Sequence, residues 1–379
     1  MIYLDNAATT PVCKAAADAA YNMMLENYGN PSSTHAAGRN AKKALDTARK
    51  QVAMALGCEP SELYFTSCGS EADNWAIVRG AEAMSKKGRH VISSTVEHDA
   101  VRKSLDELER RGFEVTRLAP DESGRVTVES VKNALRADTI LVSLMMVNNE
   151  TGALTDISGI SRMLKAEKSL ALLHTDAVQA VGHIQINAFD LNVDLMSLSA
   201  HKFHGPKGIG ALYVRDRKLI EPLIRGGMQE SGFRAGTENL PAIISMTAAL
   251  EDALSNRDAK NEKILSMRER LIDEILKISG AHLNGHRHKR LPGNANFCFE
   301  GIGGEQLVLL LDSYGIEASS GSACSARTPE PSHVLRAMRI DKALASSSLR
   351  ISIDEYNTEE EITQVINKVT FAIERMRNV

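Results

Sequence analysis

Cysteine is scarce in this sequence: five residues among 379, at positions 13, 58, 68, 298 and 324, with no Cys-x-x-Cys pair. An odd, scattered set argues against a disulfide framework and against a zinc site, and it fits a reducing cytoplasm. No run of 18 or more apolar residues occurs, so we expect no transmembrane helix. The N-terminal residues also lack the charged and then apolar pattern of a signal peptide.

The sequence also lacks a strong excess of either charge, because 45 basic residues nearly balance 48 acidic ones and leave a net charge of −3. This balance gives no indication of a nucleic-acid or membrane partner. A chain of this length, 43% hydrophobic, can form two domains around large cores. We expect a large domain over residues 15–257, and a small domain formed by residues 1–14 together with 258–379.

Strand-like and helix-like segments alternate between residues 60 and 215. This alternation predicts an α/β fold with a mostly parallel central sheet flanked by helices. Long helical patterns at 241–255 and 258–278 then lead to a smaller α+β unit, which ends in a helix that begins with a capping box at Thr358 and Glu361. The expected strands are 63–65, 90–94, 113–118, 139–146, 170–173, 194–199, 209–214, 294–299 and 348–353.

The most distinctive stretch is residues 194–210, where an apolar run stops at Ser199 and is followed by His201, Lys202 and a glycine-rich turn. Ligands of open α/β sheets bind at the carboxyl ends of the strands. A lysine at such a place can form a Schiff base with a carbonyl cofactor.

Other strand ends carry the groups that a phosphorylated pyridine aldehyde needs. Asp176 could face a pyridine nitrogen, Gln179 a ring oxygen, and the helix start at Gly69 and Ser70 a phosphate. Ser199 and His201 could donate to the same phosphate, and His98 could stack on the ring. Singly, each has an ordinary alternative as a helix cap, a turn residue or a solvated side chain. Their occurrence together at several strand ends favours a cofactor site.

Several motifs resemble those of cysteine desulfurases of the nitrogen-fixation and iron–sulfur-cluster assembly type. These are class V members of the fold-type I pyridoxal-phosphate enzymes. The resemblance extends over nearly the whole chain. The motifs are 3–11 (YLDNAATTP), 29–35 (GNPSSTH), 97–98 (EH), 147–150 (VNNE), 176–179 (DAVQ), 199–202 (SAHK), 234–239 (RAGTEN), 320–324 (SGSAC) and 330–333 (EPSH).

The resemblance implies a role for each matching residue. Lys202 would bind pyridoxal 5'-phosphate covalently and move protons at the substrate Cα, assisted by His98. Asn149 and Arg350 would bind the substrate carboxylate, which suits the planar fork of arginine. Thr237 would reach the phosphate bound by the other subunit of a homodimer. The remaining cofactor-binding residues would be Gly69, Ser70, Asp176, Gln179, Ser199 and His201, with Asn149 also beside the cofactor.

Cys324 decides which reaction the resemblance implies. The thiol would take sulfur from L-cysteine as a persulfide, release L-alanine, and pass the sulfur to an iron–sulfur scaffold or another acceptor protein. No stable metal site is expected, although Cys324 could serve as a transient iron–sulfur ligand. An ordinary buried cysteine is the structural alternative, and the small residues flanking position 324 argue against it.

Three other functions stay open at this point. A selenocysteine lyase could use the same residues, and another class V enzyme, such as an aminotransferase, would not need Cys324. A non-enzymatic sulfur carrier would be expected to lack Lys202 or Asp176. The chain also departs from the family pattern at Cys68, where glycine is usual, and at Asp354 and Glu355, where a small residue and an arginine are common.

Overall fold

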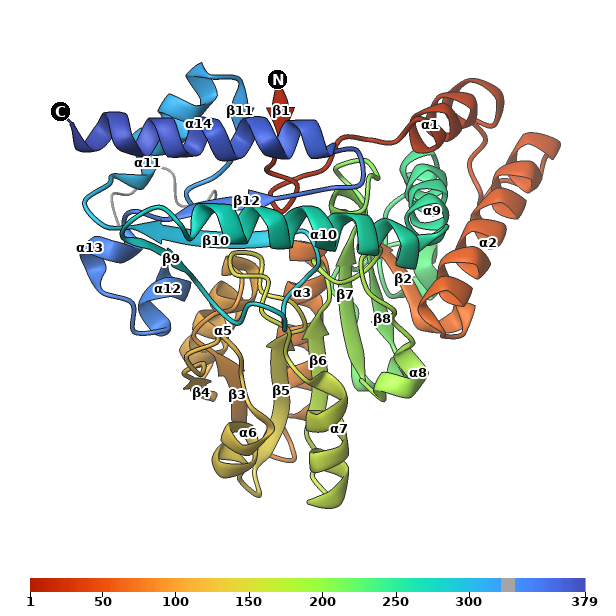
Figure 1. Ribbon diagram of the computed structural model, residues 1–379. Coiled ribbons are helices and arrows are strands. Elements are labelled where there is room, and N and C mark those ends of the chain that lie inside the picture. The colour runs from red at the N-terminus through yellow and green to blue at the C-terminus, as the bar shows by residue number, and fades with distance from the viewer. Residues whose placement is uncertain (322–330, 379) are drawn as a thin grey trace.

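A seven-stranded sheet forms the centre of the computed structural model, which describes residues 1–321 and 331–378 (Figure 1). Its order is β2-β8-β7-β6-β5-β3-β4; the pairs from β7 through β6, β5 and β3 to β4 are parallel, whereas β8 runs antiparallel to both β7 and β2. The mostly parallel sheet expected from the sequence is confirmed. The strands are β2 (Leu63–Thr66), β3 (His90–Ser94), β4 (Glu114–Leu118), β5 (Thr139–Met145), β6 (Leu172–Asp176), β7 (Leu195–Ser199) and β8 (Gly210–Val214).

Helices cover both faces of this sheet, as they must where strands are buried on both sides. One face packs against helices whose apolar side chains form a core around Trp75 and Leu105; they are α3 (Gly69–Asn74), the π-helical turn η2 (Trp75–Arg79), α4 (Gly80–Met84) and α5 (Asp99–Arg110). The other face packs against a second, larger core. Its helices are α1 (Lys14–Glu26), α2 (Ala36–Leu56), α6 (Val128–Ala134), α7 (Ile157–Ala166), α8 (Ala188–Leu191) and α9 (Leu240–Leu254).

One strand boundary differs from the prediction in a way that matters for the site. The predicted strand 170–173 is observed as β6, Leu172–Asp176, so Asp176 is the last strand residue rather than a residue beyond it. The polar side chains of His174, Thr175 and Asp176 ended the predicted strand too early. In the structure the backbone ladder continues because β5 and β7 pair on both sides of them.

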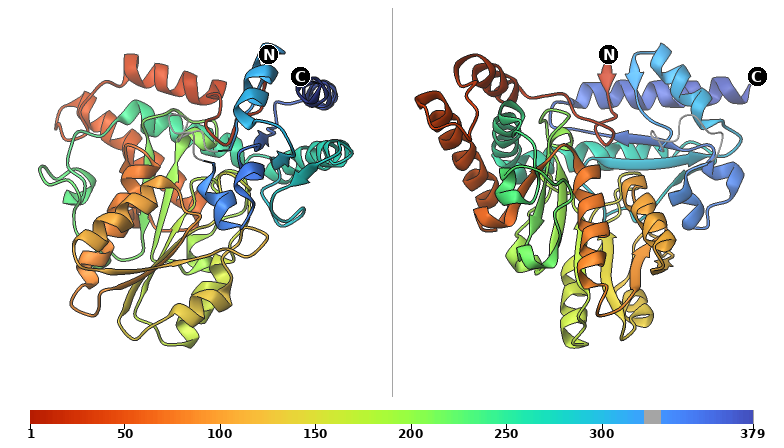
Figure 2. Two further views of the ribbon diagram at one scale, coloured as in Figure 1. Left: turned by 90° about the vertical axis from the view of Figure 1, so that its left-hand side faces the viewer. Right: turned by 180° about the vertical axis from the view of Figure 1, so that it is seen from behind.

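A smaller unit stands above the carboxyl ends of the central strands (Figures 1 and 2). It contains the antiparallel sheet β12-β10-β9, made by β9 (Ala281–Leu283), β10 (Asn294–Phe299) and β12 (Leu349–Ser352). Its core includes Ile2 and Leu4 together with residues from 264 to 373. Its other main elements are β1 (Ile2–Tyr3), α10 (Arg257–Ile275), α11 (Gly304–Ser313), β11 (Ile316–Glu317), α12 (His333–Ala337), α13 (Lys342–Ala345) and α14 (Glu359–Arg377).

The N-terminal strand β1 belongs to this smaller unit and pairs with a strand far away in the sequence. Ile2 and Tyr3 pair in parallel with Ile316 and Glu317 of β11. The predicted capping box at the start of α14 is present, with Thr358 accepting from the Glu361 amide and Glu361 accepting from the Thr358 amide. The domain limits at 14/15 and 257/258 stay a prediction. No helix among the described residues is both long and apolar enough to span a bilayer.

Candidate functional site

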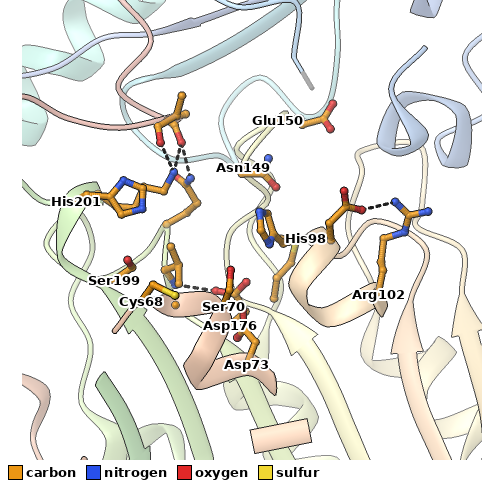
Figure 3. Close-up of a pocket in the computed structure, with 18 of the residues that line it drawn as sticks. Cys68, Ser70, Asp73, His98, Arg102, Asn149, Glu150, Asp176, Ser199 and His201 are labelled. Atoms are coloured by element: carbon orange, nitrogen blue, oxygen red, sulfur yellow. Dashed lines mark hydrogen bonds and ion pairs between the residues drawn. The ribbon is translucent and has the colours of Figure 1, made fainter. Parts of the chain in front are cut away.

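The two units enclose a cavity of about 510 Å³ at the carboxyl ends of β5, β6 and β7. Figure 3 shows side chains from the start of α3 and from the strand ends of the central sheet converging on it, and Pro331, His333 and Arg350 line it from the smaller unit. This is the position at which open α/β sheets bind ligands. The lining residues are Ala7, Ala8, Cys68, Gly69, Ser70, Asp73, His98, Asp99, Arg102, Met145, Asn149, Glu150, Asp176, Val178, Gln179, Ser199, His201, Lys202, Pro331, His333 and Arg350.

Asp176 lies in the floor of the cavity, because the end of β6 presents it there. It is 5% exposed, and one carboxylate oxygen accepts from the Val178 amide at 2.9 Å. Burial raises its pKa, whereas His98, the Val178 amide and Lys202 oppose that shift. Such a carboxyl group is suited to face a protonated ring nitrogen, which would supply the positive partner.

Lys202 ends the short 3-10 helix η3 (Ala200–Lys202) that follows β7. Its Nζ donates to the carbonyl oxygens of Ala7 at 2.7 Å and Ala8 at 2.6 Å. Gln179 Nε2 donates to the same Ala7 carbonyl at 2.8 Å. The N-terminal segment thus holds both predicted cofactor-binding side chains at the cavity wall.

The start of α3 forms a cradle for an anion. Its first residues, Gly69 and Ser70, line the cavity, and amides of a first helical turn have no carbonyl partner within the helix. A Cβ at position 69 would lie 2.7 Å from Val178 Cγ2 and 3.3 Å from Ser199 Cβ, so a larger residue there would force its neighbours to shift. Ser199 and His201 line the same wall (Figure 3).

His201 is a neutral side chain in this cradle. Burial, followed by the charge of Lys202, lowers its pKa to about 4. Its Nδ1 lies 3.2 Å from Thr9 Oγ1, which holds the ring in place. A neutral imidazole can donate one hydrogen bond to a phosphate without adding positive charge.

His98 and Asn149 lie on the opposite side of the cavity (Figure 3). His98 caps α5, and its Nδ1 accepts from the Ala100 amide at 3.1 Å. This bond fixes the tautomer, so that Nε2 carries the proton of the neutral ring. The Asn149 carbonyl oxygen accepts from Arg350 Nη1 at 3.0 Å, while its side chain lies at the cavity wall.

Arg350 comes from β12 of the smaller unit and is 1% exposed. Its Nη2 pairs with Asp5 Oδ1 at 2.6 Å, and Nη1 also donates to the Gly321 carbonyl at 3.1 Å. Its Nε has no hydrogen-bond partner among the described residues. A buried donor without a partner is costly, and an anionic ligand in the cavity would be suited to satisfy it.

Three features in and around the cavity were not identified from the sequence. Asp73 lies one helical turn after Gly69 and lines the cavity, whereas Glu97, which precedes His98, is buried behind it and bonded to Ser94 and the Met145 amide. Burial raises the pKa of Glu97 to about 8. The third feature is the pair of carbonyls at Ala7 and Ala8, which no side-chain pattern could reveal. The spacing of Asp73 from Gly69 was the one available signal, because residues i and i+4 share a helix face.

Two predicted site residues are not brought into the cavity by the described chain. Thr237 is exposed and is not among the lining residues, so its contribution to a partner's site stays a prediction. Cys324 lies outside the described residues, as does the rest of its predicted loop from 322 to 330. Cys68, which stands where the family usually has glycine, lines the cavity beside Gly69.

A family model described as "Aminotransferase class-V" matches residues 2–365. The chain belongs to this class-V family. Within the family, the cysteine desulfurase IscS of Methanosarcina thermophila is 47% identical over 378 residues, which cover 100% of this chain and 93% of that relative. The resemblance to cysteine desulfurases that was stated from the motifs is confirmed.

Two solved structures of other proteins share the fold. A "NifS-like protein" superposes with a TM-score of 0.93 at 37% identity, covering 98% of this chain and 99% of that one. A structure of SspA in complex with cysteine gives a TM-score of 0.83 at 35% identity, over 94% of this chain and 100% of the other. These likenesses confirm the fold-type I architecture predicted for the chain.

Proposed function

We propose that this protein is a cysteine desulfurase that converts L-cysteine to L-alanine and transfers the sulfur, as a persulfide on Cys324, to an acceptor protein. The observation that carries the proposal is the cavity itself. It places a lysine, a buried carboxyl group and a helix-start cradle beneath a buried arginine. Lys202, Asp176 and Arg350 thus supply the three contacts that a pyridoxal-phosphate enzyme of this family needs.

The residues present fit pyridoxal 5'-phosphate, the cofactor of the class-V family. Gly69, with no room for a Cβ, opens a cradle that fits a phosphate, and Asp176 offers a buried carboxylate to a ring nitrogen. When bound, the cofactor supplies an electron sink that makes the substrate Cα proton acidic and weakens the bond between Cβ and sulfur. The proposed binding residues are Lys202 for the aldehyde, Asp176 for the ring nitrogen, Gln179 for the ring oxygen, Gly69, Ser70, Ser199 and His201 for the phosphate, and His98 and Asn149 beside the ring.

Lys202 is proposed to move the Cα proton. Its Nζ is held by the Ala7 and Ala8 carbonyls at hydrogen-bond distance, which directs it across the cavity wall rather than to solvent. His98 stands on the other side, with Nδ1 occupied by the Ala100 amide. Its Nε2 is therefore the atom with which it would assist proton transfer.

Arg350 is proposed to bind the substrate carboxylate together with Asn149. The Asp5 carboxylate and two backbone carbonyls fix the guanidinium orientation before substrate arrives, which reduces the entropy cost of binding. The side chain of Asn149 faces the same space.

Cys324 is proposed to be the sulfur acceptor. Its thiolate attacks the substrate sulfur and forms a sulfur–sulfur bond, while the Cβ–S bond breaks and leaves its electron pair on Cβ. Cβ then takes a proton, Lys202 returns a proton to Cα, and alanine leaves. The sulfur passes to an iron–sulfur scaffold or another acceptor protein, and the working form is a homodimer in which Thr237 reaches the partner's phosphate. The cysteine pattern of the chain supports a cytoplasmic location.

The test is to incubate the Cys324→Ala variant, loaded with cofactor, with L-cysteine. It should retain the cofactor absorbance but produce neither sulfide nor alanine, while the matched Cys58→Ala variant keeps both products. Undiminished alanine production by Cys324→Ala would contradict the proposal. Parallel turnover of L-selenocysteine distinguishes the lyase: a strong preference for selenium, retained in Cys324→Ala, would favour that function instead.

A further inference from the structure

A second buried carboxyl group, Asp73, lies in the floor of the cavity near Asp176, and the proposed function leaves it without a role (Figure 3). It is 1% exposed, and its Oδ1 accepts no hydrogen bond from any described residue. An ionised carboxylate in such surroundings would carry a large desolvation cost. Asp73 therefore needs either a positive partner or a proton.

A ladder of polar side chains crosses the sheet beside Asp73. It runs through β7, β6, β5 and β3 on the strands that form the cavity floor. Ser197 Oγ lies 3.0 Å from His174 Nε2, and His174 Nδ1 lies 2.8 Å from Ser143 Oγ. Ser93 Oγ donates to the Ser143 carbonyl at 2.7 Å. The nearest oxygen of Asp73 is 3.7 Å from His174 Nε2, so the carboxyl group stands at the end of this ladder.

His174 does not neutralise Asp73 by forming an ion pair. Its ring is completely buried, and burial lowers its pKa to about 3. A neutral imidazole therefore faces Asp73 at neutral pH. The other groups near Asp73 act in the same direction: burial, the charge of Asp176, and those of Glu97 and Cys68 raise its pKa, and only hydrogen bonding with Ser197 works against them.

Asp176 has a different set of neighbours. Burial raises its pKa too, but His98, the amide of Val178 and Lys202 all favour its ionised form. Two carboxyl groups in one dry site do not both ionise, because like charges repel strongly at low dielectric. The Lys202 ammonium and the Val178 amide lie on the side of Asp176, so the charge belongs there and the proton belongs on Asp73.

We propose that Asp73 is a positioning residue that keeps its proton at neutral pH and thereby concentrates the negative charge of the cavity floor on Asp176. The functional meaning rests on the proposed function: a ring nitrogen bound at Asp176 would meet one carboxylate rather than two. Asp73 itself touches neither substrate nor cofactor in this scheme. It acts through the charge state of its neighbour.

The first test uses the full-length protein without added cofactor and follows unfolding between pH 5 and 8. A carboxyl group protonated in the native state and ionised in the unfolded state destabilises the protein increasingly as pH rises above its unfolded pKa. The unfolding equilibrium constant of wild type relative to Asp73→Asn should therefore increase roughly tenfold per pH unit until the native pKa is reached. The exposed control Asp312→Asn should show no such divergence.

The second test is spectroscopic. Infrared difference spectra at pH 7 should show a protonated-carboxyl band that is weaker in Asp73→Asn than in wild type, with the remainder assigned to Glu97, and that is undiminished in Asp312→Asn. With pyridoxal phosphate bound, the pH midpoint of the cofactor absorbance in Asp73→Asn should match that of wild type, since an amide imitates the neutral acid.

Parallel pH dependence of wild type and Asp73→Asn, an unchanged carboxyl band, or a shifted cofactor midpoint would each overturn the proposal. So would a charged His174 ring in nitrogen NMR at pH 7. Failure of wild type to bind pyridoxal phosphate would instead overturn the proposed function, and the unfolding and infrared measurements would still decide the protonation of Asp73.

Discussion

Two buried polar regions of this molecule differ in how their carboxyl groups are partnered. In the cavity floor, Asp73 and Asp176 bring two carboxyl groups together, and burial raises the pKa of each. At the junction between the two units, carboxylates are matched with cations: Arg350 with Asp5 at 2.6 Å, and His204 with Asp354 at 3.0 Å.

The difference separates a site built for a ligand from a contact built for stability. Unmatched groups in the floor are costly until a ligand with complementary charge binds, which is typical of functional sites. The junction carboxylates of Asp5 and Asp354 already have their cationic partners, although Arg350 keeps its Nε available for a ligand. The departure from the family pattern at position 354 is explained in the same terms, because Asp354 supplies the carboxylate that His204 requires.

The largest effect is expected from removing Lys202, the cation at the wall of the cavity. Lys202→Ala should lower alanine production by about 10³-fold or more, because the variant loses both the covalent attachment and the proton carrier. The cofactor absorbance of the purified variant should change with it. Lys207→Ala, an exposed lysine in the following turn, is the matched control. Activity of Lys202→Ala within tenfold of wild type would show that another group moves the proton.

Arg350 belongs to both regions, since it pairs with Asp5 and also lines the cavity. Arg350→Lys keeps the charge but loses the planar fork, so we expect kcat/KM for L-cysteine to fall by about 10²-fold. The cofactor should remain bound at unchanged affinity. A loss of cofactor with no change in kcat/KM of the loaded enzyme would instead assign Arg350 to cofactor binding.

The junction pair makes a pH-dependent prediction. Burial alone would lower the pKa of His204, but the hydrogen bond to Asp354 and its charge outweigh burial and raise it. Burial would raise the pKa of Asp354, yet His204 holds it below its usual value. The stabilisation is therefore fully present below the ordinary histidine pKa, is lost as pH rises through the raised one, and is also lost in acid as Asp354 is protonated.

Asp354→Asn should accordingly lower the free energy of unfolding by about 2 kcal/mol near pH 6. The loss is smaller than that for a buried arginine–carboxylate pair, because His204 can become neutral when its partner is removed. The deficit should shrink as pH rises past the raised pKa of His204. Denaturant titrations at pH 6 and pH 9 measure it, with Asp312→Asn as the exposed control. A deficit of equal size at both pH values would mean that packing, rather than charge, holds this contact.

The smallest effect is expected at the cradle. Gly69→Ala places a methyl group 2.7 Å from Val178 Cγ2, so α3 must shift by a few tenths of an ångström. We expect the affinity for pyridoxal phosphate to fall about tenfold, with little change in turnover once the cofactor is saturating. Gly208→Ala is the control, because a Cβ at position 208 meets nothing within 4 Å. The φ of +84° at this position adds backbone strain but no clash with the cradle, so the cofactor affinity should not fall in the same way.

The part of the cavity floor that is formed by strand ends could be predicted from the sequence, because apolar runs identify strands. Apolar runs located β5, β6 and β7, and the polar residues that end them were therefore expected at one edge. Asp73 was missed because its helix face becomes meaningful only when α3 packs over β6 and β7. The Asp5–Arg350 and His204–Asp354 pairs join residues 345 and 150 positions apart, and no local pattern indicates such partners.

The pairing of β1 with β11 has a consequence for the order in which the protein is made. A ribosome releases the central sheet, which ends at Val214, well before it has synthesised the strand that receives Ile2 and Tyr3. The first residues of the chain must therefore wait, unpaired, for residues 316 and 317, and the Asp5 partner arrives later still at position 350. The wall formed by Ala7 and Ala8 can therefore take its place in the cavity only after residue 350 has been synthesised, and ligand binding depends on both units having folded.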